Sequence, residues 1–280
     1  MAGVRVVTDS SCDLPADVVA EHGIEVVPLT IRFGTEEFVD RVDLSPAQFW
    51  ARCASSSALP ETAAPAPGAF EEAFRRAAAA DADGVVCINL ASKLSATSQS
   101  AQTAAQAVEG DVAVRVVDST SVTLGLGMIV VAAARLAAGG AGLDEVVAEA
   151  ENLAGRTRVH GALDTLEYLQ RGGRIGKAQA LLGSILSVKP IIEVRDGAVE
   201  PGPKLRTRSK ALAYLAERVA AEPALENLAV LHGDAPDVDA FLAMLDPHFP
   251  RQRIVVGDLG AVVGTHAGPR TIGVAFQVPG

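Results

Sequence analysis

A cluster of hydroxyl side chains follows an apolar stretch in the first half of the chain. The segment Ile88–Gln102 reads INLASKLSATSQSAQ, with hydroxyls at Ser92, Ser95, Thr97, Ser98 and Ser100. The pattern predicts a strand, then hydroxyls, then a helix. Neutral hydroxyls and the N–H groups of a helix start suit a single carboxylate, whereas a phosphate site usually needs more positive charge than Lys93 alone. Helix capping by Ser95 alone is the alternative interpretation.

A second polar segment, TDSSCDLP, follows the first predicted strand, Val4–Val7. Ligands bind beyond the carboxyl ends of strands in open α/β sheets, so the run Thr8–Ser11, which includes Asp9 and Ser10, is a candidate ligand-facing loop. A hydrogen-bonded turn with Asp13 as a helix cap explains the same residue types. Both interpretations stay open at this point.

Two later segments carry positive charge or an imidazole beside glycines. The segment QRGGRIGK contains Arg171, Arg174 and Lys177, and its adjacent glycines permit a turn with positive φ that can hold Arg174. Near the end of the chain, GTHAGPR places His266 between glycines. A surface arginine and a lone structural histidine are the alternatives, so neither segment defines a chemistry by itself.

Several common chemistries lack their sequence signatures. The chain has no G-x-G-x-x-G or P-loop segment for a nucleotide and no G-x-S-x-G nucleophile elbow. Its three cysteines, Cys12, Cys53 and Cys87, match no zinc-site spacing. We therefore expect no metal, no cofactor and no catalytic residues. The formal net charge of −10 argues against non-specific binding of nucleic acid.

The order of predicted elements favours an α/β protein. Strand-like and helical segments alternate through the first half, which predicts a mainly parallel sheet with flanking helices. After Arg156 come a strand, a broken helical region over residues 166–186, a hairpin with its turn at Asp196–Gly197, and further helices and strands. We predict two α/β domains, residues 1–156 and 157–280, the second with mixed α/β structure.

Composition indicates a cytoplasmic protein with a large core. Hydrophobic residues make up 49% of the 280 residues. The most apolar window, Val122–Ala134, is shorter than the ~20 residues of a membrane span, so it predicts a buried helix. Dispersed cysteines and a start that resembles no signal peptide suit the cytoplasm. We expect no integral membrane segment, while transient contact with a membrane surface stays open.

Six segments taken together resemble a known family. The chain contains, in one order over nearly its whole length, TDSSCDLP, LPETAAPAPGAF, LSATSQSA, VDSTSVTLGLG, LEYLQRGGRI with KPII, and THAGP. Each is weak alone, but the ordered set resembles the DegV family, the fatty-acid-binding subunits of bacterial fatty acid kinase. The resemblance implies two α/β domains that enclose one long-chain fatty acid, such as palmitate or oleate, in an apolar tunnel.

The resemblance also implies roles for individual residues. In the family a threonine and a serine hold the carboxylate, and the matching positions here are Thr62 and Ser95. A histidine near the head group matches His266, and an arginine in a G-G-R-I turn matches Arg174. A separate kinase catalytic subunit phosphorylates the bound carboxylate to an acyl phosphate. Further candidates near the head group or facing the kinase are Asp9, Ser10, Thr97 and Arg174.

The chain departs from the family pattern close to these residues. The departures are Ala63 and Ala64 for a Ser-Gln pair, Ala96 for a glycine, Ser98 for a tyrosine and Arg270 for a glycine. Thr62 and Ser95 are kept, so lipid binding is expected to persist. The departures remove polar groups of the family pattern, so contact with the kinase and the preferred acyl chain are the two properties that they affect.

Two classes of function follow from these observations. The leading interpretation is a carrier without catalytic activity, which holds a fatty acid and presents its carboxylate to a kinase. The alternative is a stand-alone hydrolase or phosphotransferase that uses Asp9, Ser95 and His266. A hydrogen bond to a charged carboxylate contributes roughly 1.5–3 kcal/mol, and each buried methylene about 0.8 kcal/mol. We therefore expect the acyl chain to set affinity and the hydroxyls to set orientation.

Overall fold

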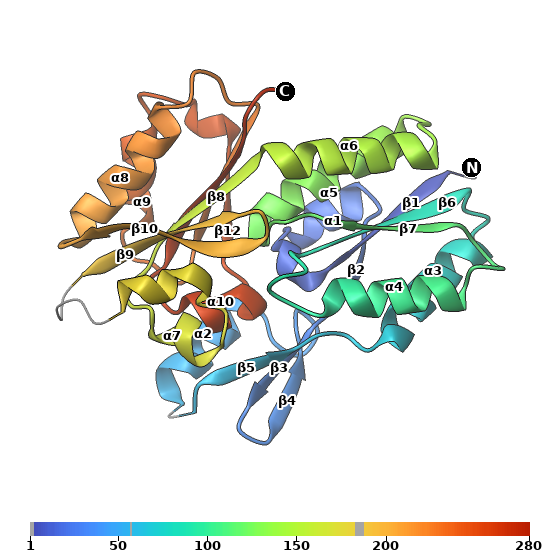
Figure 1. The fold of residues 1–280 in the computed structure, drawn as a ribbon, viewed down its shortest axis with the longest axis horizontal. Helices are drawn as coiled ribbons and strands as arrows, with labels where there is room; N and C mark the ends of the chain where they lie inside the picture. Colours follow the sequence, from blue (N-terminus) through green and yellow to red (C-terminus); the bar gives the residue numbers. More distant parts are fainter. Residues whose placement is uncertain (1–2, 57, 183–187) are drawn as a thin grey trace.

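A parallel sheet of four strands forms the first half of the molecule. The computed structural model describes residues 3–56, 58–182 and 188–280. Within them this sheet has the order β2-β1-β6-β7 (Figure 1). Its strands are β1 (Val4–Asp9), β2 (Glu25–Val27), β6 (Gly84–Asn89) and β7 (Val114–Asp118). All three pairings are parallel, as the alternation of strands and helices predicted.

Helices cover both faces of this sheet, which is why its strands carry apolar residues on both faces. One face packs against α3 (Pro67–Ala79) and α4 (Thr97–Ala107), and the other against α5 (Thr123–Ala138) and α6 (Leu143–Arg156). Neighbouring residues of β1 show the alternation. Val7 lies in the cluster with the aromatic rings of α3, and Val6 lies in the cluster with α5.

A second, mixed sheet forms the other half, in the order β10-β9-β8-β13-β11-β12. Its strands are β8 (Thr157–Ala162), β9 (Lys189–Arg195), β10 (Ala198–Leu205), β11 (Asn227–His232), β12 (Ile254–Asp258) and β13 (Ile272–Gln277). The β9–β10 hairpin turns at Asp196 and Gly197, both with positive φ, as the Asp-Gly signal predicts. Helices α8 (Arg208–Ala220) and α9 (Val238–Leu245) pack on one face.

Helix α5 lies between the two sheets and packs against both (Figure 1). Leu126, Ile129 and Val130 have no exposed surface. The predicted buried helix in this window is therefore confirmed. One core cluster extends from Val6 of β1 through α5 to Ala275 of β13. Thr157 of β8 directly follows the last residue of α6, where the sequence pattern changes, but the core continues across this point, so the division into two domains stays a prediction.

A small antiparallel sheet, β4-β3-β5, was not predicted. Its strands are β3 (Thr30–Phe33), β4 (Glu36–Val39) and β5 (Pro60–Ala63). The apolar run over residues 24–31 is divided between two sheets, because β2 ends at Val27 and β3 begins at Thr30. Pro28 lies between them, and proline has no N–H for a strand ladder. The segment before α3, which is rich in serine and proline, contains β5, and β5 pairs with β3.

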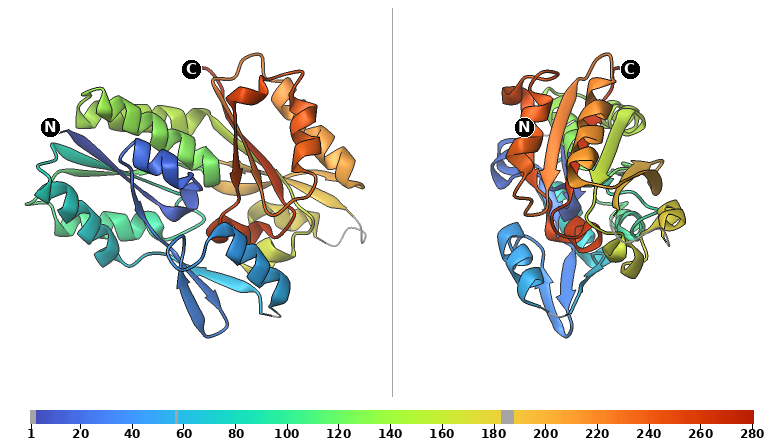
Figure 2. Two further views of the ribbon diagram at one scale, coloured as in Figure 1. Left: turned by 180° about the vertical axis from the view of Figure 1, so that it is seen from behind. Right: turned by 90° about the vertical axis from the view of Figure 1, so that its left-hand side faces the viewer.

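The remaining helices are short and lie around this small sheet and the ends of the larger ones. They are α1 (Ala16–Glu21), α2 (Pro46–Ser55), α7 (Glu167–Arg171), α10 (Ala261–Ala267) and the 3-10 turns η1 (Ser10–Cys12), η2 (Gly176–Leu181) and η3 (Arg251–Arg253). Figure 2 shows α2 beside the hairpin of β3 and β4, with α10 next to them. The predicted broken helical region consists of α7 and η2 as far as Leu182, and residues 183–186 lie outside the described residues.

Helix α10 was not predicted, and its packing involves the single tryptophan of the chain. The indole Nε1 of Trp50 in α2 donates a hydrogen bond to the Leu259 carbonyl at 3.2 Å. The ring lies so close to Gly264 of α10 that a Cβ there would be 2.8 Å from Trp50 Cζ2. Glycine at this position therefore lets α10 approach α2.

The predicted helix cap at Asp13 is wrong. Pro15 occupies the N-cap position of α1, and Asp13 adopts a left-handed conformation at the end of η1. Its carboxylate accepts hydrogen bonds from Thr123 Oγ1 at 2.6 Å and from the Gly260 N–H at 3.1 Å. The side chain therefore joins the start of the chain to the segment before α10.

Candidate functional site

A narrow cavity of about 80 Å³ brings together four polar residues that the sequence analysis assigned to a head-group site. They are Thr62, Ser95, Arg174 and His266. The rest of the wall consists of leucine, valine, isoleucine and alanine side chains from both halves of the chain, among them Leu29, Leu90, Leu94, Ile192 and Val263. The cavity therefore has polar groups on an otherwise apolar lining.

Thr62 and His266 form a direct hydrogen bond although they are far apart in the sequence. Thr62 is on β5, opposite Ile31 of β3, and His266 is in the last turn of α10. The Thr62 Oγ1 and His266 Nε2 atoms are 3.0 Å apart. Burial, with a smaller contribution from the charge of Arg174, lowers the pKa of His266 to about 4. The imidazole is therefore neutral at pH 7 and acts as a hydrogen-bonding group.

The two adjacent glycines of the QRGGRIGK segment have different roles. Gly173 has a φ of +69°, which confirms the predicted turn with positive φ. Gly172 instead provides space, because a Cβ there would lie 2.2 Å from His266 Nδ1. The turn after α7 therefore fixes the position of the imidazole.

Arg174 connects this turn to the loop before α4. Its Nε donates to the Leu94 carbonyl at 3.0 Å, and its Nη1 donates to the Gly172 carbonyl at 2.8 Å. The neighbouring cations pair elsewhere: Arg171 with Glu167 and Lys177 with Glu200. Arg174 is thus the cation of this segment that lines the cavity.

The hydroxyl cluster divides into groups with different partners. Ser95 lines the cavity, and its Oγ is 2.9 Å from Thr97 Oγ1, a buried neighbour. Ala96, not Ser95, occupies the N-cap position of α4. Ser92 hydrogen-bonds to Asp118 on β7, and Ser98 donates to the Leu90 carbonyl at 3.5 Å. Ser95, with Thr97 behind it, is therefore the part of the cluster that can meet a ligand here.

Asp9 and Ser10 were candidates for the head group or the kinase-facing surface, but the structure places them elsewhere. Both side chains have no exposed surface. Asp9 accepts from the Leu90 N–H at 2.9 Å, and Ser10 Oγ accepts from the Leu29 N–H at 3.1 Å. Burial raises the pKa of Asp9, despite these hydrogen bonds. The two residues therefore hold the backbone of two leucines in the cavity wall.

The same contacts argue against a catalytic triad. The hydrogen bonds of the Asp9 carboxylate go to Ser11, Asn89 and the Leu90 N–H. His266 has Thr62 as its partner, and its Nδ1 has no hydrogen-bond partner among the described residues. A triad requires the acid to orient the imidazole. The structure does not join Asp9, Ser95 and His266 in that way.

Two further cavities share lining residues with the first, and we call them the outer and the inner cavity. An outer cavity of about 460 Å³ shares Thr62, Arg174 and His266 with it and is also lined by Glu61 and Tyr168. An inner cavity of about 50 Å³ shares apolar residues with it, including Val122, Ile192, Val194, Val263 and Ala267. Three of the four polar residues therefore also line the outer cavity, whereas the residues shared with the inner cavity are apolar.

These features define a class of protein: an α/β protein with a narrow, mainly apolar cavity that has a few polar residues in its wall. Over the described residues, no group of three or more His, Cys, Asp and Glu side chains could hold a metal ion. None of the helices in the described ranges is long and apolar enough to cross a membrane.

Comparison with known proteins identifies the family. The model of the DegV family, described as "Uncharacterised protein, DegV family", matches residues 3–278, so the chain belongs to this family. A DegV domain-containing protein of Streptomyces coelicolor is 42% identical over 278 residues, 98% of each chain. The family and the α/β fold that the ordered motifs predicted are therefore confirmed.

Solved structures of similar proteins cover the whole chain. A structure described as fatty acid binding of a DegV family protein from Thermus thermophilus is 34% identical, with a TM-score of 0.90, and the match covers 99% of this chain and 100% of that one. DegV of Bacillus subtilis, described as a fatty acid binding protein, is 28% identical with a TM-score of 0.87 and full coverage of both chains.

Proposed function

We propose that this protein binds one long-chain fatty acid, such as palmitate or oleate, with its carboxylate held by Thr62 and Ser95 and with His266 beside the head group. The acyl chain extends into the apolar interior. The observation that carries the proposal is the meeting of these polar residues in the wall of an otherwise apolar cavity. The descriptions of the Thermus and Bacillus relatives as fatty acid binding give independent support.

Neutral groups can hold this carboxylate if each donates a hydrogen bond. The Thr62 hydroxyl can donate to the ligand only when His266 Nε2 donates to Thr62 Oγ1, since a hydroxyl has one hydrogen. The low pKa of His266 keeps the imidazole neutral, and the tautomer with hydrogen on Nε2 supplies that donor. His266 is therefore a positioning residue that directs the Thr62 hydroxyl toward the ligand.

The acyl chain requires more room than the two inner cavities provide. Their volumes are about 80 and 50 Å³, whereas ligand sites commonly enclose ~300 Å³ or more. The apolar side chains between them must therefore move apart as the chain enters. Each buried methylene contributes about 0.8 kcal/mol, so a long chain can offset the cost of that rearrangement.

The outer cavity suits presentation of the carboxylate to a second protein. It borders Thr62, Arg174 and His266, and its other polar residues include Glu61 and Arg171. We propose that the catalytic subunit of a fatty acid kinase reaches the carboxylate from this side and forms the acyl phosphate. On this proposal the protein is a cytoplasmic carrier without catalytic residues or a cofactor of its own.

The direct test is extraction of the purified protein with organic solvent followed by mass spectrometry. We expect about one equivalent of a long-chain fatty acid per chain. Protein stripped of lipid should take up added palmitate or oleate with the same stoichiometry. An extract without fatty acid, together with no uptake by the stripped protein, would contradict the proposal.

A further inference from the structure

The inner cavity of about 50 Å³ has a wall whose polar side chains are already engaged or point elsewhere. The hydroxyl of Thr123 donates to a carboxylate, and the hydroxyl of Thr271 donates to a backbone carbonyl. The ring of His160 stacks on Phe276, which belongs to the core cluster of α8 and α9. Five apolar residues of this wall also line the first cavity, whereas its described residues share none with the outer cavity. The inner cavity therefore suits an apolar group that enters from the first cavity.

Two glycines lie side by side in the wall of the inner cavity. Across β9, β8, β13 and β11, the residues paired at one level are Ile192, Gly161, Gly273 and Leu231. All four line the cavity. Residues paired across neighbouring strands point to the same face of a sheet, so Ile192 and Leu231 flank a strip of backbone that carries no side chains.

The backbone gives no reason for glycine at either position. Neither Gly161 nor Gly273 has a positive φ. The pairing of β8 with β13, and of each with its other neighbour, continues without a register shift, so neither glycine marks a bulge. A glycine inside a strand then indicates a place where a ligand or another backbone approaches closely.

Close packing of another element does not explain the pair either. In α5, by contrast, a Cβ on Gly125 would lie 2.6 Å from Val159 Cγ2, so that glycine lets the helix approach the sheet. Among the described residues, a Cβ on Gly273 would meet within 4 Å only the His160 carbonyl oxygen and Leu231 Cδ1, which both belong to its own sheet. The strip therefore leaves room for a ligand in the cavity.

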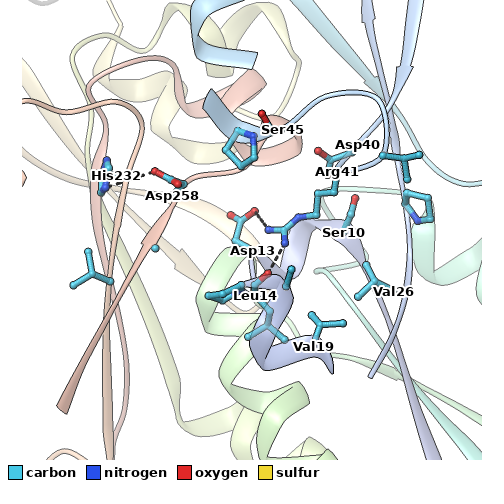
Figure 3. Close-up of a pocket in the computed structure, with 17 residues that line it drawn as sticks. Ser10, Asp13, Leu14, Val19, Val26, Asp40, Arg41, Ser45, His232 and Asp258 are labelled. Carbon is cyan, nitrogen blue, oxygen red and sulfur yellow. Dashed lines mark hydrogen bonds and ion pairs between the residues drawn. The ribbon is translucent and has the colours of Figure 1, made fainter. Parts of the chain in front are cut away.

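A larger cavity of about 590 Å³ beside β12 is less suited to an acyl chain. Its described lining residues include none of those around the first and inner cavities. Figure 3 shows the charged side chains of Asp13, Arg41 and Asp258 around it. Hydrocarbon placed against charged groups displaces their water without replacing its hydrogen bonds. The acyl chain is therefore better accommodated by the inner cavity.

We propose that Gly161 and Gly273 receive the methyl end of the acyl chain and so limit the length of the fatty acid that the protein binds. The inference rests on the proposed function, which places the carboxylate in the first cavity. A Cβ on either glycine would fill the strip and leave the last methylenes of a long chain without a place. Each methylene that is not buried lowers the affinity about fourfold.

The test compares the lipid-free wild type with Gly161→Ala in titrations of laurate, myristate, palmitate and stearate. A Cβ on Gly161 would lie nearest to two side-chain atoms, Leu163 Cδ1 at 3.3 Å and Ile192 Cγ1 at 3.5 Å, so small side-chain shifts can accommodate it. We expect the affinity for stearate to fall at least about tenfold, as for two unburied methylenes, and the affinity for laurate to change less than about twofold. Gly273→Ala is the second variant, with the same expectation. The control Gly155→Ala, at an exposed position of α6, should keep the wild-type ratio of affinities.

The same titrations separate this inference from the proposed function. Uptake of palmitate by the wild type tests the proposed function, whereas the ratio of stearate to laurate affinity tests the role of the glycines. An unchanged ratio in either variant, or an equal loss for all four acids, would overturn that role while fatty acid binding by the wild type stands. The lipid-free variants should also unfold at the wild-type temperature or higher, because alanine inside a strand loses less backbone entropy on folding than glycine. A lower unfolding temperature in both variants would show that packing requires the glycines and would overturn the inference as well.

Discussion

At the scale of single residues, the hydrogen bond between Thr62 and His266 is the contact that, on the proposed function, directs a hydroxyl toward the ligand. An imidazole that was charged at pH 7 would attract many anions. A neutral imidazole behind a threonine offers directed hydrogen bonds instead. On the proposed function, these bonds would recognise the acceptor geometry of a carboxylate at the end of an apolar chain.

Removing both hydroxyls tests this arrangement. We expect Thr62→Ala combined with Ser95→Ala to weaken palmitate binding by a few kcal/mol at most, since each hydrogen bond to a charged group contributes ~1.5–3 kcal/mol and the apolar cavity remains. The preference for palmitate over hexadecanol should fall in a competition titration. Thr103→Ala, which removes an exposed hydroxyl from α4, is the control. An unchanged preference in the double variant would place the head group elsewhere.

At the scale of elements, the short turn after α7 positions the site from one side. Gly172 leaves space for the imidazole, and Arg174 binds the carbonyl of Leu94 on the neighbouring loop. Both residues are positioned by this short turn and not by a long helix or strand. The site is thus assembled by short elements held against the larger sheets.

Gly172→Ala should disturb the imidazole directly. The new Cβ would lie 2.2 Å from His266 Nδ1 and 3.1 Å from the Tyr168 carbonyl, so the ring must move and its bond to Thr62 must lengthen. We expect lower affinity for palmitate and a loss of stability of about 1–3 kcal/mol from overpacking. The matched control is Gly155→Ala in α6, where a Cβ meets nothing within 4 Å. Normal palmitate affinity in Gly172→Ala would show that the ring position is unimportant.

Arg174→Ala separates lipid binding from presentation to the kinase. The carboxylate is assigned to other residues, so we expect the variant to fold and to copurify with fatty acid. Acyl phosphate formation with the kinase and ATP should be slow at saturating variant protein, because the guanidinium beside the outer cavity is lost. Arg5→Ala, which removes an exposed charge from β1 at a position that does not line the outer cavity, should behave normally. A normal rate with Arg174→Ala would remove Arg174 from the mechanism, and loss of lipid would place it in the binding site.

The elements that could be predicted from the sequence are those with long, regular apolar patterns. Helix α5 and the strands β1 and β6 are of this kind, because the apolar residues that cause their burial lie within their own segments. By contrast, β5 has one buried residue, Pro60, and α10 has seven residues, so packing against other elements decides their structure. The local pattern at Ser95 indicated a carboxylate site, but Thr62 and His266 are 204 positions apart and were joined only through the family resemblance.

At the scale of the whole molecule, the two sheets share one core and several buried polar links. Asp13 is one such link, because it contacts Thr123 of α5 and the Gly260 N–H. The sequence could not show this role, since the interpretation of Asp13 as a local cap used nearby residues only. Long-range partners of a buried carboxylate depend on how the halves pack.

Asp13 also predicts a pH dependence of stability. Burial raises its pKa from 3.8 to about 7, so between pH 4 and pH 7 the folded protein binds more protons than the unfolded chain. The free energy of unfolding should therefore fall as pH rises through this window, by up to about 1.4 kcal/mol per pH unit from this group. Urea unfolding from pH 5 to pH 8 should show a weaker decrease for Asp13→Asn. Identical slopes for variant and wild type would contradict the assignment.

The packing of Trp50 against Gly264 has a practical consequence. The indole is the single tryptophan of the chain, it is buried, and it touches the helix that carries His266 two residues later. Any shift of α10 during ligand entry changes the surroundings of this one fluorophore. Its emission therefore supplies an intrinsic optical signal, and stopped-flow fluorescence can measure the rate at which the unlabelled protein binds a fatty acid.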